Sequence, residues 1–123
     1  MPPLKRRILC VDDDEDTCEA LTQLLKRENY EARSVDNIQA ALDLAHKESF
    51  NLYILDSWFP QEGGTVLCQR IREFDPQTPI VFYSGAALES DRNEALHAGA
   101  DAFVAKPYFE ELLETVHRLL SGL

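Results

Sequence analysis

Short, fully apolar runs alternate along this chain with longer segments whose apolar residues recur at helical spacing. The runs at 8–11, 52–55, 79–83 and 102–105 are typical of strands buried on both faces, and residues 30–35 alternate as a half-exposed strand does. Helices are predicted at 15–28, 38–45, 66–74, 88–98 and 108–120. Because strands and helices alternate, we predict an α/β fold with a parallel sheet covered by helices on both faces.

Chain length and charge limit what such a fold can do. The 123 residues, 45% of them apolar, suit a single domain, which we expect to span residues 1–123. The formal net charge is −10, from 12 Lys and Arg against 22 Asp and Glu. Because contacts with nucleic-acid phosphates need clustered Lys and Arg, this balance argues against direct nucleic-acid binding.

The sequence indicates neither a membrane segment nor a secretory signal. It has no uninterrupted apolar run of about eighteen residues, and basic residues 5–7 precede an apolar run too short for a signal peptide. Cys10, Cys18 and Cys68 lie far apart in apolar patterns without metal-ligand spacing, so we expect small core residues. An odd number of cysteines without a signal predicts a reducing, cytoplasmic location.

Chemically active side chains follow four of the five predicted strands at the point where each strand ends. They are Asp12 and Asp13 after the first strand, Asp56 after the third, Ser84 after the fourth and Lys106 after the fifth. In an open parallel sheet the carboxyl ends of the strands lie along one edge, where ligands bind. We therefore expect these side chains to converge. Asp36, after the second strand, is predicted to have only a turn role.

The expected site carries an excess of negative charge. Two unit charges about 4 Å apart repel by roughly 4 kcal/mol at an effective dielectric near 20, so close carboxylates need cations. Lys106 supplies one positive charge, and oxygen ligands without His or thiolate favour Mg²⁺, or Mn²⁺, over Zn²⁺. Such a site can receive a phosphoryl group, with Ser84 donating a hydrogen bond to it. Asp56, followed by a loop with Pro60 and two glycines, is the best candidate for an aspartyl-phosphate nucleophile.

Four segments, in order and at matching intervals, resemble the receiver domain of two-component response regulators. They are residues 8–14, 52–56 with Pro60 and Gly64 beyond them, 81–85 and 99–107, and the resemblance covers the whole chain. It implies a flavodoxin-like fold, which is a three-layer α/β/α sandwich of (βα)5 type. Its five-stranded parallel sheet would have the strand order 2-1-3-4-5.

The resemblance implies how the acceptor and the metal would be arranged. Asp56 would accept a phosphoryl group from a phosphohistidine on a sensor histidine kinase or a phosphotransfer protein. Asp13, Asp56 and the main-chain carbonyl of Trp58 would ligate Mg²⁺, and Asp12 would act through a water molecule.

The resemblance also implies a conformational switch. Lys106, expected before a cis bond to Pro107, would pair with the phosphoryl group. Ser84 would move toward a phosphoryl oxygen, and Phe103 would change rotamer as the conformational reporter. The surface formed by residues 88–120 would then bind a downstream protein. The chain would be a phosphorylation-switched signalling domain that catalyses only its own phosphorylation and dephosphorylation, and so not an enzyme in the usual sense.

Departures from the family's usual pattern remove no required chemical group. Ser84 stands where Thr is common, and Phe103 stands where Tyr is common. Trp58 is unusually bulky beside the acceptor, and three arrangements are open: an exposed partner-binding anchor, a ring folded over the site, or packing within the loop. The last helix lacks the basic ending of many DNA-binding regulators, which weakens any inference about dimerisation.

Other polar residues are given structural roles. Residues 14–16 are expected to form an acidic helix start, which the helix dipole favours. His46, His97 and His117 lie on predicted helices away from the strand ends, so we expect surface histidines.

Two other functions stay open. A small Mg²⁺-dependent phosphatase of the haloacid dehalogenase type also uses an Asp nucleophile, but it needs a second Asp where this chain has Trp58. A receiver-like interaction module would keep the fold and act without phosphorylation. The sequence does not identify the donor kinase, the output partner or the phosphorylated lifetime. Whether the chain is a complete regulator or the first domain of a longer one stays open; the absence of a linker after the last predicted helix favours a stand-alone protein or a trimmed chain.

Overall fold

The computed structural model, which describes residues 5–121, is built around one five-stranded sheet. The strands are β1 (Arg7–Val11), β2 (Glu31–Val35), β3 (Leu52–Leu55), β4 (Ile80–Ser84) and β5 (Ala102–Ala105). All neighbouring strands are parallel, in the order β2-β1-β3-β4-β5. The predicted fold class and strand order are confirmed.

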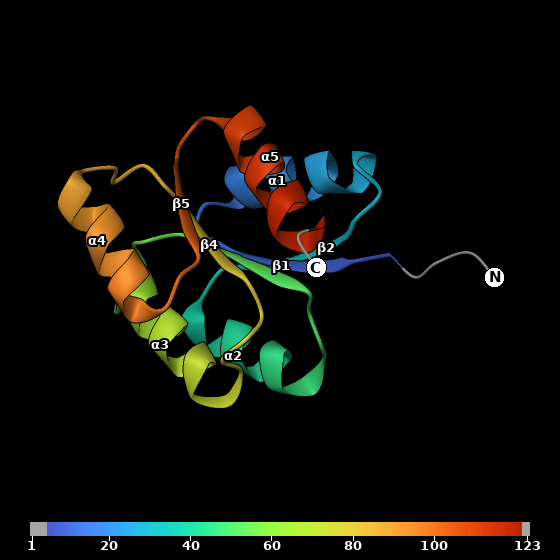
Figure 1. The fold of residues 1–123 in the computed structure, drawn as a ribbon. Helices are drawn as coiled ribbons and strands as arrows, with labels where there is room; N and C mark the ends of the chain where they lie inside the picture. Colours follow the sequence, from blue (N-terminus) through green and yellow to red (C-terminus); the bar gives the residue numbers. More distant parts are fainter. Residues whose placement is uncertain (1–4, 122–123) are drawn as a thin grey trace.

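Five helices cover the two faces of the sheet. They are α1 (Glu15–Arg27), α2 (Ile38–Lys47), α3 (Gly64–Phe74), α4 (Glu89–Ala98) and α5 (Phe109–Ser121). Helices α1 and α5 lie on one face, and α2, α3 and α4 lie on the other, which gives the predicted three layers (Figure 1). None of these helices is long and apolar enough to cross a membrane.

Side-chain alternation along the strands fills two separate cores. In β1, Ile8 and Cys10 pack with residues of α1 and α5, whereas Leu9 and Val11 pack with residues of α2, α3 and α4. Because both faces are covered, residues 8–11 of β1 and all residues of β3 and β4 are buried, as the continuous apolar runs predicted, whereas the edge strand β2 alternates and is partly exposed. The three cysteines are buried and free, which confirms their prediction as core residues.

Local capping explains where several helices begin and end. The Asp14 side chain accepts a hydrogen bond from the backbone N–H of Thr17 at the start of α1, and Asn37 does the same for Ala40 in α2. Helix α4 ends at Gly99, whose φ of 116° lies in the left-handed region that favours glycine. The structural role predicted for residues 14–16 is confirmed.

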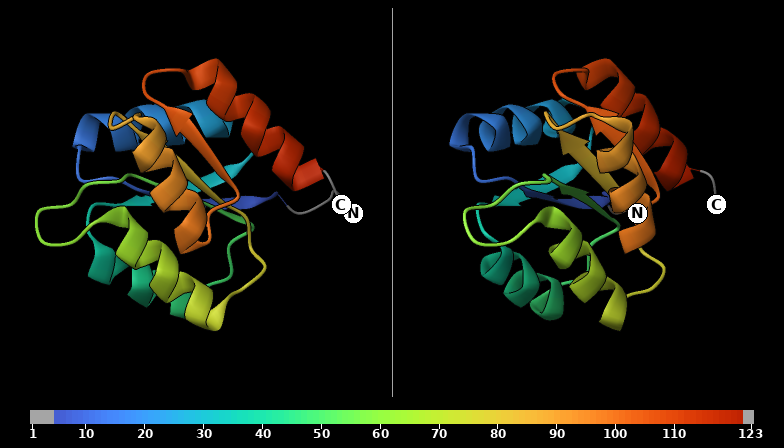
Figure 2. Two further views of the ribbon diagram at one scale, coloured as in Figure 1. Left: turned by 60° about the vertical axis from the view of Figure 1, so that its left-hand side comes forward. Right: turned by 90° about the vertical axis from the view of Figure 1, so that its left-hand side faces the viewer.

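The parallel topology brings the loops that follow the strands to one end of the molecule. In both views of Figure 2, the long loop between β3 and α3 extends from the same end as the turn between β1 and α1. This end of the sheet, called the carboxyl edge below, carries residues 12, 13, 56, 84 and 106 directly at or after the strand ends.

Candidate phosphoacceptor and metal site

Three carboxylates meet at the carboxyl edge. One oxygen each of Asp12, Asp13 and Asp56 lies within 4.8 Å of the other two. Asp12 and Asp56 are buried, at 3% and 8% exposure, whereas Asp13 is exposed. Within residues 5–121 no other group of three His, Cys, Asp or Glu side chains comes this close together. The convergence expected from the strand ends is present for all three.

Lys106 lies among these carboxylates. Its Nζ is 2.8 Å from a carboxylate oxygen of Asp12 and 3.6 Å from one of Asp56. The side chain leaves the end of β5 just before a cis peptide bond to Pro107, as predicted. One ammonium therefore faces three carboxylates, and the site keeps an excess of negative charge.

Burial and charge perturb these groups in ways that follow from the geometry. The pKa of Asp56 is raised above 3.8, first by burial and then by the neighbouring charge of Asp12, with Lys106 opposing the shift. The pKa of Lys106 is also raised: burial lowers it, but the hydrogen bond to Asp12 and the charge of Asp56 outweigh burial. A bound cation would therefore stabilise the charges of this site, whereas a further negative charge would not.

Backbone hydrogen bonds fix the site to the sheet. The N–H of Asp56 donates to the carbonyl of Val11 at 2.9 Å, which ties the end of β3 to β1. The N–H of Lys106 donates to the carbonyl of Ser84 at 2.8 Å, which ties β5 to β4. Ser84 is fully buried, and its Oγ accepts a hydrogen bond from the N–H of Ala86 at 3.1 Å. Its hydroxyl is therefore held by the loop that leads to α4.

The loop after the acceptor approaches the strand end closely. A Cβ on Gly64 would lie 1.9 Å from the carbonyl oxygen of Asp56, so only glycine fits there. The N–H of Gly64 donates to the carbonyl of Ser57 at 2.8 Å, and Trp58 forms an antiparallel bridge with Gly63. Trp58 is 65% exposed, so its ring is not folded over the site; its role as a partner-binding anchor stays a prediction.

A family model for the response regulator receiver domain matches residues 8–117. The chain belongs to this family. Receiver domains are phospho-accepting signalling domains, and the family resemblance found in the four sequence segments is confirmed.

Curated relatives of this receiver domain are bacterial regulators. The nisin biosynthesis regulatory protein NisR of Lactococcus lactis subsp. lactis is 35% identical over 102 residues, which are 83% of this chain and 44% of NisR. The transcriptional regulatory protein YrkP of Bacillus subtilis (strain 168) is 38% identical over 107 residues, which are 87% of this chain and 46% of YrkP. The chain thus spans about half the length of these curated relatives.

A solved structure agrees with the fold over nearly its whole length. The CheY-like response regulator receiver domain protein from Methanospirillum hungatei JF-1 is 31% identical, with a TM-score of 0.91 over 97% of this chain and 96% of that one. The receiver domain described here therefore has both the sequence and the topology of its family.

The donor set of this receiver domain fits a hard divalent cation. Three carboxylates within 4.8 Å offer only oxygen ligands, and no His or Cys belongs to the cluster. Oxygen-only sites with several carboxylates suit Mg²⁺ and Mn²⁺ rather than Zn²⁺. The acidic pocket in which receiver domains bind Mg²⁺ is thus present in this chain.

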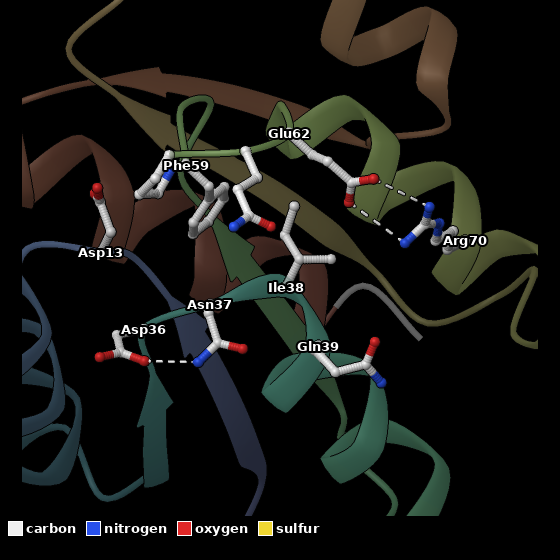
Figure 3. Close-up of a pocket in the computed structure, with 10 residues that line it drawn as sticks. Asp13, Asp36, Asn37, Ile38, Gln39, Phe59, Glu62 and Arg70 are labelled. Carbon is white, nitrogen blue, oxygen red and sulfur yellow. Dashed lines mark hydrogen bonds and ion pairs between the residues drawn. The ribbon is translucent and has the colours of Figure 1, made fainter.

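A cavity of about 750 Å³ opens beside Asp13, between the turn after β2 and the loop after β3. Figure 3 shows Asp13 at one end, the paired Asp36 and Asn37 below it, and the Glu62–Arg70 ion pair on the far side. Phe59 lies between these groups. The cavity leaves the solvent side of Asp13 open to an incoming molecule. Asp36, predicted only as a turn residue, also lines it.

The structure adds contacts that the sequence did not indicate. His117 is exposed, as are His46 and His97, but it also contacts the Tyr30 hydroxyl through Nδ1 and lies 3.1 Å from the Glu28 carboxylate through Nε2. Phe103 is buried and is covered by Arg92. Neither contact has a local sequence pattern: Tyr30 and His117 are 87 residues apart, and the contact of Arg92 depends on how α4 lies against β5.

Proposed function

We propose that Asp56 accepts a phosphoryl group from a phosphohistidine on a sensor histidine kinase or a phosphotransfer protein. The chain is a receiver domain of two-component response regulators, whose standard function is phosphorylation-based switching. The observation that carries the proposal is the position of Asp56: a buried carboxylate at a strand end, 3.6 Å from the Lys106 ammonium and beside two further carboxylates.

Asp13, Asp56 and the main-chain carbonyl of Trp58 would hold Mg²⁺, and Asp12 would act through a water molecule. When bound, the ion neutralises negative charge on the transferring group. Asp12 also holds Lys106 in place through its 2.8 Å contact, so the ammonium is already positioned beside the acceptor.

The ionised carboxylate of Asp56 is the nucleophile. One of its oxygens forms a bond to phosphorus while the P–N bond of the phosphohistidine breaks, and the electron pair of that bond stays on the imidazole. Lys106 pairs with a phosphoryl oxygen as negative charge accumulates there. No external oxidant, reductant or further co-reactant is needed.

Phosphorylation replaces the single negative charge of the ionised Asp56 carboxylate with a phosphoryl group that carries close to two. The Ser84 hydroxyl would leave its contact with Ala86 and donate to a phosphoryl oxygen, and Phe103 would report the change by its rotamer. A two-state equilibrium moves from 1:99 to 99:1 with about 5.5 kcal/mol of differential interaction, which a phosphoryl group paired with Lys106 and a divalent ion can largely supply. The surface formed by residues 88–120 would bind a downstream protein in the cytoplasm, without direct nucleic-acid contact by this domain.

The test is phosphorylation by acetyl phosphate with Mg²⁺, followed by intact mass and peptide mapping. We expect one phosphoryl group on the wild-type chain and none on Asp56→Asn. Asp43→Asn, at an exposed aspartate of α2, should be labelled like the wild type. Labelling that persists in Asp56→Asn would place the acceptor elsewhere. Continuous turnover of para-nitrophenyl phosphate would instead favour the phosphatase alternative.

A further inference from the structure

Helix α4 has unusually little apolar contact with the rest of the molecule. Its buried residues are Ala95 and Ala98, both in its C-terminal half. None of residues 89–94 is buried, and Leu88, just before the helix, is 71% exposed. Helix α5, by contrast, buries larger side chains along its whole length, among them Leu112, Val116 and Leu120. The N-terminal half of α4 must therefore be positioned by polar or charged contacts.

Arg92 supplies two such contacts, both to Phe103 of β5. Its guanidinium carbon lies 5.3 Å from the centroid of the Phe103 ring, and its Nη1 donates a hydrogen bond to the Phe103 carbonyl at 3.3 Å. A planar guanidinium can stack on an aromatic face and donate to a carbonyl at the same time. Arg92 therefore fastens the N-terminal half of α4 to β5.

Phe103 in turn belongs to a packed series that reaches the acceptor. Its ring is buried and stacks on Phe82 of β4, with centroids 6.3 Å apart and planes 11° from parallel. The Phe82 ring and the carbonyl of Asp56 both lie against Gly64, where an added Cβ would meet them at 3.0 and 1.9 Å. Contacts are thus continuous from the backbone of Asp56 through Gly64, Phe82 and Phe103 to Arg92.

A second connection joins α4 to the site through the chain itself. Ser84 ends β4, its Oγ accepts from Ala86, and only residues 85–88 separate it from α4. Arg92 lies one turn into the helix, where its N–H donates to the carbonyl of Leu88 at 3.1 Å. A displacement of Ser84 toward Asp56 would therefore pull on the end of α4 that Arg92 fastens.

We propose that Arg92 is a positioning residue that restrains the switch: it holds the N-terminal half of α4 on Phe103 and so opposes the displacement of Ser84. This consequence rests on the proposed function of Asp56. A contact made in the resting state and loosened in the phosphorylated state lowers the affinity for a phosphoryl group. Removing the contact should then raise that affinity.

The test is calorimetric titration with beryllofluoride, a phosphoryl analogue, in the presence of Mg²⁺. Arg92→Gln keeps helix propensity and removes both contacts; we expect about two- to fivefold tighter binding, as the loss of one exposed cation–π contact allows. Arg92→Lys, which keeps a cation over the ring, should return most of the way to the wild-type affinity. Ser90→Ala, on an exposed position of the same helix half, should bind like the wild type.

The expected direction separates restraint from simple charge loss, because removing a positive charge weakens anion binding. Unchanged or weaker binding by Arg92→Gln would overturn the proposal.

Hydrogen exchange without ligand tests separately whether Arg92 holds the N-terminal half of α4 against β5. In Arg92→Gln we expect faster amide exchange in residues 85–94 and unchanged exchange in 95–98, with Ser90→Ala like the wild type. If residues 85–94 exchange at the same rate in Arg92→Gln and in the wild type, the proposal is overturned whether or not beryllofluoride binds. Failure of the wild-type chain to bind beryllofluoride would instead count against the proposed function of Asp56.

Discussion

The two ends of the sheet use charged side chains in opposite ways. At the start of β1 and β2, Arg7 lies 2.6 Å from Glu31 and 2.5 Å from Glu48, and Arg33 lies 2.5 Å from Glu48. This Arg7 network (Arg7, Glu31, Arg33 and Glu48) has two cations and two carboxylates. The carboxyl edge has one ammonium, that of Lys106, among three carboxylates. One end is balanced, and the other is not.

The pKa shifts follow this difference. Hydrogen bonds from Arg7 and Arg33 lower the pKa of Glu48, whereas burial and the charge of Asp12 raise the pKa of Asp56. The Arg7 network therefore satisfies its own charges, and the carboxyl edge needs a further cation to do so. A domain that keeps such an imbalance at one end loses some stability and gains a binding site.

The largest expected effect comes from removing the cation of the unbalanced end. Lys106→Met leaves Asp12, which is 3% exposed, and Asp56 without their positive partner, so the free energy of unfolding should fall by about 3 kcal/mol. Urea denaturation measures this, with Lys47→Met at an exposed position of α2 as the control. A fall below about 1 kcal/mol would show that the carboxylates do not depend on Lys106.

Adding a divalent cation should correct the same imbalance in the wild-type chain. Mg²⁺ at ten times its dissociation constant should raise the free energy of unfolding by about 1.4 kcal/mol, because it binds only the folded site. The gain should disappear in Asp13→Asn and persist in Glu48→Gln. Thermal unfolding with and without MgCl2 measures it, and an equal gain in Asp13→Asn would mean that the ion binds elsewhere.

Neutralising the acceptor should stabilise the fold at neutral pH. Asp56 has a folded-state pKa above 3.8, so the folded chain holds this proton more tightly than the unfolded chain. The free energy of unfolding of the wild-type chain should therefore fall as the pH rises from the ordinary aspartate pKa through the raised pKa of folded Asp56. Asp56→Asn lacks this loss, so its free energy of unfolding at pH 7 should be about 1 kcal/mol higher than that of the wild type. Urea denaturation across this pH range checks both; a variant less stable than the wild type at pH 7 would contradict the account.

The smallest effect is expected at the balanced end. Glu48→Gln removes a half-buried carboxylate between two arginines, and ion pairs that stay open to solvent contribute little. We expect a fall in Tm of about 1–3 °C and no change in beryllofluoride affinity. A change in that affinity would mean that the two ends of the sheet are energetically coupled and do not act independently.

The parallel topology allowed the site to be predicted from the sequence. Because parallel strands must present their carboxyl ends together, Asp12, Asp56 and Lys106 could be placed near one another before any coordinates, although they are up to 94 residues apart. The cis bond before Pro107 and the glycine against Asp56 also agree with the family's pattern. These features follow from strand order and local motifs.

Contacts between elements could not be predicted in this way where no sequence motif marks them. Arg7 and Glu48 are 41 residues apart, and each looks like an ordinary surface charge in the sequence. The same holds for Arg92 on Phe103 and for His117 against Tyr30, which depend on how helices lie across strands. The exposure of Trp58 depends on the conformation of one loop, so three arrangements stayed open until the structure placed it.

The most direct test of the central claim is a crystal structure of the wild-type chain with Mg²⁺ and beryllofluoride. The account predicts beryllium bonded to a carboxylate oxygen of Asp56, a fluorine beside the Lys106 ammonium, and the metal between Asp13 and Asp56. Beryllofluoride on any other carboxylate, with Asp56 left unmodified, would contradict it.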